Sequence, residues 1–324
     1  MLRFLRLDPF LIALFAAIIV ATLLPARGAA AEALALVTTA SIVLLFFLHG
    51  AKLSREAILN GIGAWRLHLM TLSMTYVVFP VLTLGLYLLP EGWPDPFILS
   101  GFLFLAVLPS TVQSSIAFTG IAGGNVAAAV CAASLSNLLG ILITPLLAGL
   151  LVNSGPAGAD FLLSGVTKVA TTLLLPFVAG HLARPLIGGW VDRHRALVGR
   201  TDRSAIVLVV YSAFGAAVTD GLWHKVSLFD LVLITLLSLL LLGLLLWITR
   251  LVARMAKLSH ADETVLVFCG SKKSLASGVP MAGALFPAAQ VGMIILPLMI
   301  FHQIQLIVCA ALADAYARRL QPNR

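Results

Sequence analysis

Long apolar runs, separated by polar or Pro/Gly-containing breaks, recur along the whole chain. A helix needs about 20 predominantly apolar residues to cross the hydrocarbon core of a bilayer, and most of these runs approach or exceed that length. The pattern predicts ten transmembrane helices, over residues 8–24, 32–51, 67–89, 97–119, 125–151, 161–183, 203–219, 228–250, 262–286 and 290–317. We therefore expect an all-α polytopic membrane protein with a single membrane domain over residues 1–324.

Composition agrees with this class, because 60% of the residues are hydrophobic and only 10% are charged, against about 25% charged in a soluble domain. The net charge of +8 would suggest nucleic acid in a soluble protein. Basic loops on the cytoplasmic side explain it better here. The expected partners are the lipid bilayer and a small-molecule solute, with no nucleic acid and the oligomeric state open. Cys131, Cys269 and Cys309 lie in apolar segments and predict neither a disulfide framework nor a metal cluster.

Charge placement fixes the expected topology. If the N-terminus, the even-numbered loops and the C-terminus are cytoplasmic, nearly all loop Lys and Arg residues fall on that side, and only Arg27 and Lys225 fall on the other. This positive-inside bias predicts both termini in the cytoplasm. The first segment has the alternative interpretation of a cleaved signal peptide, but the topology requires it as a helix.

The ten helices divide into two halves at the polar linker NSGPAGAD, residues 153–160. The first five-helix repeat spans 8–151 and the second spans 161–317. An odd number of helices in each half inserts the halves in opposite directions, which is a recurrent plan of transporters. Short echoes, such as LLPARG near Pro25 and LLPFVAG near Pro176, favour such an inverted repeat.

The fourth helix of each half contains a polar run. These runs are LPSTVQSSIAFTG (108–120) and CGSKKSLASGVP (269–280). Interrupted helices at corresponding positions indicate a transport site, because the freed backbone groups are tolerated only beside protein or water. Hydroxyls that bond back to their own helix and support packing are the alternative for any single serine. The candidate solute or ion ligands in the two runs are Ser110, Thr111, Gln113, Ser114, Ser115, Ser271 and Ser274, with Ser277 beside them.

Two adjacent lysines lie inside the second run. Lys272 is about ten residues into its predicted span, or about 15 Å deep, which is close to the middle of the membrane. An ionisable residue at that depth is a functional hypothesis by default, with snorkelling to the interface as the alternative. Lys273 points about 100° away on a regular helix, so both lysines would face one site only if the helix unwinds at Gly270. Lys168 is nearer a helix end, and for this residue snorkelling to the interface and a functional role are equally compatible with the sequence.

No Asp or Glu occupies a predicted midplane position. A lysine there could carry a proton, act as a fixed cation where another transporter binds sodium, or attract an anionic substrate. Three polar residues outside the two runs also receive expected roles, and two of them, Asn137 and Gln303, complete the site candidates. Asn125 is a plausible N-cap of the fifth helix, Asn137 could reach the site from that helix, and Gln303 is expected to face the core, with an interhelical hydrogen bond as its alternative role.

Several stretches resemble the bile acid:sodium symporter superfamily, in particular the branch that contains solute carrier family 10 member 7 and its bacterial relatives. The carrying stretches are FFLHGAKLSREAI (46–58), WRLHLMTLSMTYVVFP (65–80), LPSTVQSS (108–115), AGGNVAAAVCAASLSNLLG (122–140) and FCGSKKSLASGVPM (268–281). The resemblance implies ten helices, an inverted repeat, and separate panel and core domains. It also implies that the discontinuous helices 4 and 9 cross at the substrate and ion region.

The sequence departs from the sodium-coupled members of this superfamily at the positions of their ligands. Ser114 matches the family's serine, but Ser115 stands in place of the following asparagine. Alignment to the family places the remaining ligand positions at Thr75, Ala129, Ala133, Val267 and Ser271. The glutamate of the ninth helix corresponds to Val267, so the family's sodium ligands are not matched. We expect no cofactor and no metal site, while sodium stays open as a coupling ion, and bile acid is not implied as the substrate.

The sequence therefore predicts a secondary active transporter that moves a small organic anion or amphipathic metabolite by alternating access, coupled to sodium or to protons. The alternative is a non-transporting membrane regulator or receptor with a transporter fold, since the resembling animal branch is associated with calcium handling. An enzyme is not expected, because HExxH, GxSxG and paired intramembrane carboxylates are missing. The GSKKS stretch also lacks the glycine spacing of a P-loop.

Overall fold

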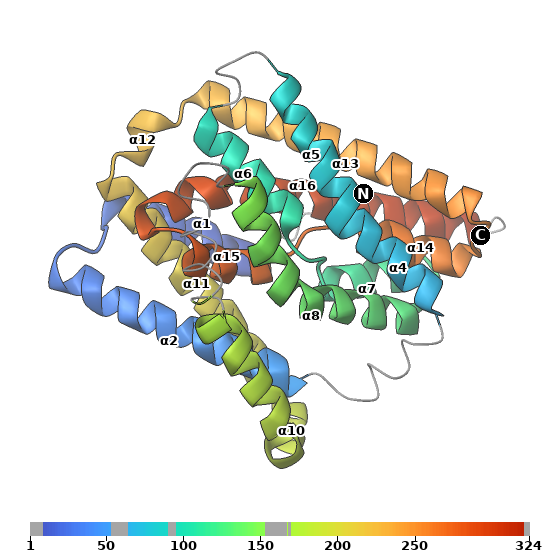
Figure 1. The fold of residues 1–324 in the computed structure, drawn as a ribbon, viewed down its shortest axis with the longest axis horizontal. Coiled ribbons are helices and arrows are strands. Elements are labelled where there is room, and N and C mark those ends of the chain that lie inside the picture. The colour runs from blue at the N-terminus through green and yellow to red at the C-terminus, as the bar shows by residue number, and fades with distance from the viewer. Residues whose placement is uncertain (1–8, 53–63, 90–94, 153–166, 168–169, 321–324) are drawn as a thin grey trace. The chain divides into compact units, whose positions relative to one another are not determined.

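A computed structural model describes residues 9–52, 64–89, 95–152, 167 and 170–320 (Figure 1). Within these ranges the regular structure is helical, without strands. The α-helices are α1 (Pro9–Leu23), α2 (Ala29–Lys52), α4 (Trp65–Ser73), α5 (Phe79–Leu84), α6 (Pro96–Val107), α7 (Gln113–Ile121), α8 (Val126–Leu151), α10 (Leu175–Arg193), α11 (Arg195–Thr219), α12 (Leu222–Lys225), α13 (Leu228–Met255), α14 (His260–Gly270), α15 (Leu275–Leu285) and α16 (Ala288–Leu320). Two π-helices, η3 (Met74–Val78) and η5 (Ala170–Leu174), and the 3₁₀-helix η4 (Gly85–Leu88) extend these elements.

Seven helices are long and apolar enough to cross a membrane, counted over the described residues. They cover Ala29–Lys52, Trp65–Leu88, Val126–Leu151, Ala170–Arg193, Arg195–Thr219, Leu228–Met255 and Ala288–Arg319. The expectation of an all-α integral membrane protein is confirmed, whereas the total of ten helices stays a prediction. The linker 153–160 and Lys168 lie outside the described residues.

The chain forms two compact units. Unit one contains Met1–Lys52, Thr167–Ser227 and Val279–Met293, and unit two contains Leu53–Val166, Leu228–Gly278 and Ile294–Arg324. Each unit combines segments that are distant in the sequence. The expected repeats, 8–151 and 161–317, are instead consecutive halves of the chain. The division into two units does not test them, so the repeats stay a prediction.

In unit one, α2 and α10 touch backbone to backbone through two glycines. A Cβ atom on Gly50 would overlap the carbonyl oxygen of Phe177, and one on Gly180 would overlap the carbonyl oxygen of Phe47. Small residues let membrane helices approach closely enough for extensive packing contact. The two glycines therefore set the spacing of this helix pair.

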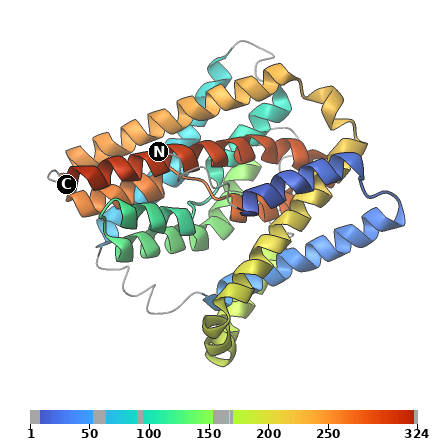
Figure 2. The same cartoon turned by 180° about the vertical axis from the view of Figure 1, so that it is seen from behind.

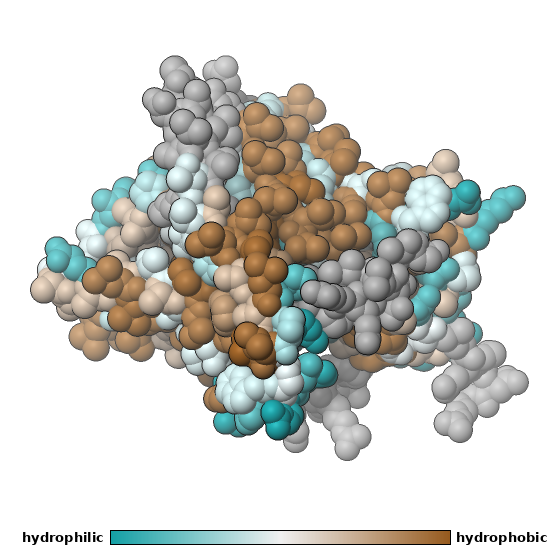
Figure 3. Space-filling model, turned by 60° about the horizontal axis from the view of Figure 1, so that its bottom comes forward, coloured by the Kyte–Doolittle hydropathy of each residue, from teal (hydrophilic) through white to brown (hydrophobic). Residues whose placement is uncertain are grey.

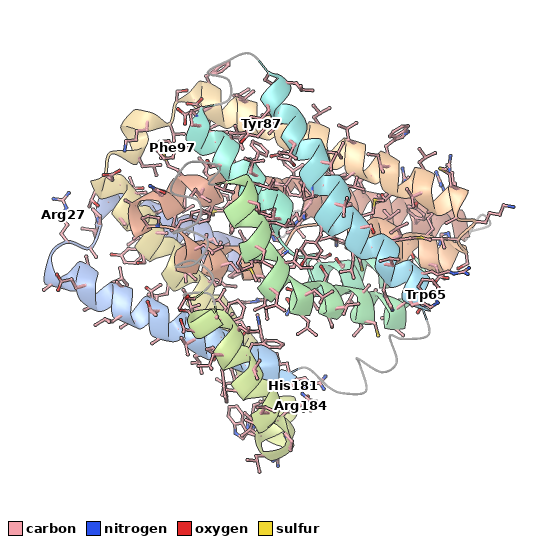
Figure 4. The ribbon with its side chains drawn as sticks, viewed as in Figure 1. Arg27, Trp65, Tyr87, Phe97, His181 and Arg184 are labelled. Carbon is pink, nitrogen blue, oxygen red and sulfur yellow. The ribbon has the colours of Figure 1, made fainter. Side chains whose placement is uncertain are left out.

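Charged groups gather at the C-terminal end of α2. Lys52 forms an ion pair with Asp202 of α11, and His49 Nε2 lies 3.7 Å from the same carboxylate. The Arg184 guanidinium donates a hydrogen bond to the carbonyl oxygen of Ala51, which satisfies one of the carbonyls that a helix end leaves open. Figure 4 shows Arg184 and His181 close together on α10, beside this end of α2.

In unit two, α4, η3, α5 and η4 form one continuous rod over residues 65–88 (Figure 1). A rod of 24 residues is about 36 Å long, enough for a hydrocarbon core of about 30 Å. Trp65 and Tyr87 are exposed at its opposite ends (Figure 4). Aromatic side chains in these places are typical of membrane–water interfaces.

The long helices α13 and α16 run side by side in both views (Figures 1 and 2). The outer face of α13 exposes apolar side chains, including Leu236, Leu240 and Trp247. Figure 3 shows a broad hydrophobic surface with hydrophilic residues mainly toward its margins. Such a surface is unfavourable in water and suits contact with lipid.

Candidate solute-binding site

Two breaks in membrane helices meet within unit two. The first separates α6, which ends at Val107, from α7, which begins at Gln113. The second separates α14, which ends at Gly270, from α15, which begins at Leu275. The backbone N–H of Ser274 donates to the carbonyl oxygen of Pro109 over 2.9 Å, which links the breaks directly. The two polar runs singled out in the sequence are thus interrupted and in contact.

Side chains of α8 satisfy the backbone of the first break. Thr144 Oγ1 donates to the carbonyl oxygen of Val107 over 2.7 Å, and Asn137 Nδ2 donates to that of Ser110 over 2.8 Å. The Ser110 N–H donates to Ser136 Oγ over 3.1 Å. Because unpaired backbone groups cost several kcal/mol in an apolar medium, these three side chains make the break tolerable.

Gln305 of α16 satisfies the second break. Its Oε1 accepts the backbone N–H of Lys273 over 2.9 Å, and its Nε2 donates to the Lys273 carbonyl over 2.8 Å. Ser274 caps α15, because its Oγ accepts the Ser277 N–H over 3.1 Å. Ser277 Oγ in turn donates to Asn137 Oδ1 over 2.7 Å. Asn137 therefore joins the first break to the first turn of α15.

A chain of hydroxyl groups leads from Lys272 into α7. Lys272 Nζ donates to Ser114 Oγ over 3.3 Å, and Ser114 donates to Thr111 Oγ1 over 2.9 Å. Thr111 and Ser115 share a hydrogen bond of 2.8 Å, and Ser115 donates to the Phe268 carbonyl over 2.8 Å. Since the Ser115 proton is committed to that carbonyl, Thr111 is the donor to Ser115. All four bonds therefore run in one direction.

The Lys272 side chain is completely buried, but it makes a single hydrogen bond with the described residues. Its Nζ lies 4.4 Å from the ring centre of Phe118 and 5.7 Å from that of Phe268. An ammonium has three donors, so two are left without a protein acceptor among the residues that the structure describes. Aromatic faces stabilise the cation without using these donors.

Lys273 is also completely buried, and its environment is the opposite. Its Nζ donates to three carbonyl oxygens, those of Thr75 over 2.7 Å, Ala106 over 2.6 Å and Leu108 over 2.7 Å. The ring centre of Phe79 lies 4.4 Å away. All three donors are used, so Lys273 has none to offer a solute. The break at Gly270 leads the two side chains into different surroundings.

The remaining candidate residues differ in burial and in hydrogen bonding. Ser110 Oγ is buried without a hydrogen-bond partner among the described residues. Ser271 donates to the Val267 carbonyl of its own helix over 2.6 Å, which is the packing role named as its alternative. Gln113 is exposed at the start of α7. Gln303 is half-buried and forms no hydrogen bond within the described ranges, so a role in the site stays a prediction.

Sequence reasoning did not place four residues that build or support the site. Gln305 was noticeable only as one of several polar residues in an apolar helix. Ser136 and Thr144 resemble the many hydroxyl residues that bond within their own helix. Tyr76 donates to the Ser136 carbonyl over 2.7 Å, and its neighbourhood gave no signal. What Gln305, Ser136 and Thr144 share, an intramembrane polar atom aimed at a break, becomes visible only in three dimensions.

Three of the positions at which the resemblance expects sodium ligands carry no side-chain oxygen. Ala129, Ala133 and Val267 are fully buried and offer no side-chain oxygen. The Ser115 hydroxyl already donates to the Phe268 carbonyl. Across the described part of the chain, no group of three or more His, Cys, Asp or Glu residues could hold a metal ion.

Comparison with known proteins agrees with this architecture. Residues 8–318 match the SBF-like CPA transporter family. The chain is 52% identical over 315 residues to "Putative symporter YfeH" of Escherichia coli (strain K12), covering 97% of this chain and 94% of the relative. It is 28% identical over 314 residues to "Sodium/bile acid cotransporter 7" of Rattus norvegicus, covering 95% and 92%. Because the family match spans nearly the full length, the chain belongs to the SBF-like CPA transporter family.

Proposed function

We propose that the chain is a secondary active transporter that moves a small organic anion or amphipathic metabolite by alternating access. The observation that carries this is the buried ammonium of Lys272 at the meeting point of two helix breaks, where two of its donors have no acceptor among the described residues. An ionisable group inside a membrane is costly and is typically retained for function. The membership in a transporter family and the symporter names of relatives support the same class.

The surroundings of Lys272 favour an anionic ligand with an apolar part. The ammonium has no carboxylate partner in the described ranges, so a carboxylate, sulfonate or similar group would supply the missing countercharge. The rings of Phe118 and Phe268 beside Nζ provide apolar contact. These groups together are complementary to an amphipathic anion.

The site residues all belong to unit two. In the proposed mechanism this unit acts as the core domain and unit one as the panel, and movement between them exposes the site to each side in turn. The ten-helix inverted repeat and cytoplasmic termini in a bacterial plasma membrane belong to the same proposal. Positive-inside loops support that orientation.

The test is charge-selective transport in proteoliposomes, recorded as currents on a solid-supported membrane. The panel contains acetate, benzoate, succinate and taurocholate, each paired with a neutral analogue such as benzamide. We expect at least one anion, and none of the neutral analogues, to give a saturable current. Lys272→Met should abolish this current, whereas Lys225→Ala, which removes an exposed lysine paired with Asp220, should leave it unchanged.

Two results would count against the proposal. Equal currents from the wild type and Lys272→Met would refute the role of the lysine. Saturable binding of an anion without current or tracer uptake would instead favour the regulator or receptor class.

A further inference from the structure

The carbonyl oxygens around Lys273 form a cage of three, defined by Thr75, Ala106 and Leu108. They lie 2.7, 2.6 and 2.7 Å from Nζ. The side chain is fully buried, and the Phe79 ring centre lies 4.4 Å from the charge. Among the described residues no Asp or Glu pairs with this ammonium. Its charge is therefore balanced by backbone dipoles and an aromatic face, as for a cation held in a carbonyl filter.

The sequence leaves the first cage carbonyl without a helical donor. Thr75 lies in the π-helix η3, where a carbonyl bonds to the N–H five residues on. The Phe79 N–H follows this rule and donates to the Met74 carbonyl. The corresponding donor for Thr75 would come from Pro80, which has no N–H. The Thr75 carbonyl is therefore free to face Lys273.

The end of α6 frees the second cage carbonyl in a similar way. The Ala106 carbonyl could accept from the residue three or four positions on. The residue three positions on is Pro109, which has no N–H. The next residue is Ser110, whose N–H donates instead to Ser136 Oγ. The cage also sits at the C-terminus of α6, where the helix dipole favours positive charge.

The cage resembles a binding site for a free monovalent cation. Its oxygen contacts are much longer than the about 2.0–2.1 Å that magnesium requires, and it offers no carboxylate, which calcium sites usually include. Backbone carbonyls alone are the ligands that potassium filters use. Lys272, one residue earlier, has no comparable set of carbonyls in the part of the chain that the structure describes, so the cage belongs to Lys273 specifically.

We propose that the Lys273 ammonium is a tethered cation that fills a monovalent-cation site of the protein's own making. The ammonium joins η3 and the α6 end to the second break, the role that a bound ion would otherwise have. Wild-type protein therefore needs no free sodium or potassium to assemble this region. Removal of the side chain exposes a site for a small monovalent cation, with ammonium and methylammonium as the closest mimics. This cation site does not rest on the proposed transport function.

The test is thermal unfolding of the purified full-length protein in detergent, at equal ionic strength in choline, sodium, potassium, ammonium or methylammonium chloride. Wild type should unfold at the same temperature in all five salts. Lys273→Ala should unfold at a lower temperature in choline and recover by about 3 °C or more in ammonium, methylammonium or potassium. Lys272→Ala is the matched control, and its unfolding temperature should not depend on the cation.

Lys273→Met checks that the effect comes from an open cage, because the methionine side chain keeps most of the volume and leaves no room for an ion. It should show no cation-specific recovery. Recovery of folded Lys273→Ala only when ammonium or potassium salt is present during purification would support the proposal equally. A Lys273→Ala protein whose unfolding temperature is the same in every salt would refute it.

If Lys273→Ala does not fold, the unfolding temperature of the wild type in the different salts provides the test. A rise in its unfolding temperature in sodium or potassium relative to choline would contradict a cage that is already filled. None of these measurements requires transport. A failed flux assay with a positive cation recovery would thus remove the proposed function and leave the tethered cation standing.

Discussion

Replacing Gln305 by leucine tests how the second helix break is stabilised. Gln305 is fully buried, and its amide accepts from the Lys273 N–H and donates to the Lys273 carbonyl. Leucine has a similar volume but neither a donor nor an acceptor. The substitution therefore leaves two backbone groups without partners inside an apolar environment.

The expected cost follows from this count. Interhelical side-chain hydrogen bonds in membrane proteins average about 0.6 kcal/mol, so two bonds give a lower limit of about 1 kcal/mol. Buried groups left unsatisfied cost about 1–3 kcal/mol each, so the upper limit is about 6 kcal/mol. We expect Gln305→Leu to lower the free energy of unfolding within this range, toward the upper half, because both orphaned groups belong to the backbone and cannot rotate toward water.

The measurement is equilibrium unfolding in mixed detergent, followed by tryptophan fluorescence. Gln303→Leu is the matched control, because Gln303 lies on the same helix, is half-buried and makes no hydrogen bond in the described ranges. It should change the free energy by less than about 0.5 kcal/mol. Equal effects of the two substitutions would show that Gln305 does not support the break.

Two further predictions concern packing and capping. Gly180→Ala should destabilise unit one by about 1–3 kcal/mol, because the new Cβ would overlap the Phe47 carbonyl oxygen. Gly189→Ala on the same helix meets no atom within 4 Å and should stabilise by about 0.5–1 kcal/mol. Thermal unfolding compares the two variants, and equal shifts in unfolding temperature would contradict the close approach of α2 and α10. Asn125→Ala should lower the free energy of unfolding by about 1 kcal/mol, because Asn125 Oδ1 accepts the Ala128 N–H over 3.0 Å. Asn125→Ser should retain most of the stability in the same assay. A loss of stability as large as that of Asn125→Ala would argue against capping.

The sequence predicted the positions of the two helix breaks well, because local chemistry determines them. Pro109 cannot continue the helix that precedes it, and Gly270 ends α14 where the serine- and lysine-containing run begins. Asn125 was likewise recognisable as an N-cap from its place before an apolar run, and its side chain accepts from Ala128 as expected. Such features depend on a few neighbouring residues.

The roles of the two lysines could not be separated in the same way. Helical geometry predicts that neighbouring side chains point in different directions, but not what each one meets. The partners of Lys273 come from η3 and α6, more than a hundred residues away in the chain. The π-helix that frees the Thr75 carbonyl has no simple sequence signature apart from Pro80. Long-range contacts of this kind depend on tertiary packing.

The last helix shows the same limit, because the sequence analysis expected Gln303 to face the core, whereas Gln305 is the fully buried residue of the two. Two residues correspond to about 200° of rotation on a helix, so one of them points to the core and the other away. α16 is apolar on most sides, and Pro297 interrupts its regular pattern. The rotational phase of the helix was therefore not readable, and the structure buries Gln305.

The central claim is that Lys272 supplies the positive charge that a transported anion meets. The most direct test is the dissociation constant of the best anion from the transport panel, measured by titration calorimetry on wild type and Lys272→Met. A hydrogen bond to a charged group contributes about 1.5–3 kcal/mol, so the dissociation constant should rise by about tenfold to more than a hundredfold, while Lys225→Ala should leave it unchanged. An anion that binds wild type and Lys272→Met equally well would contradict the account.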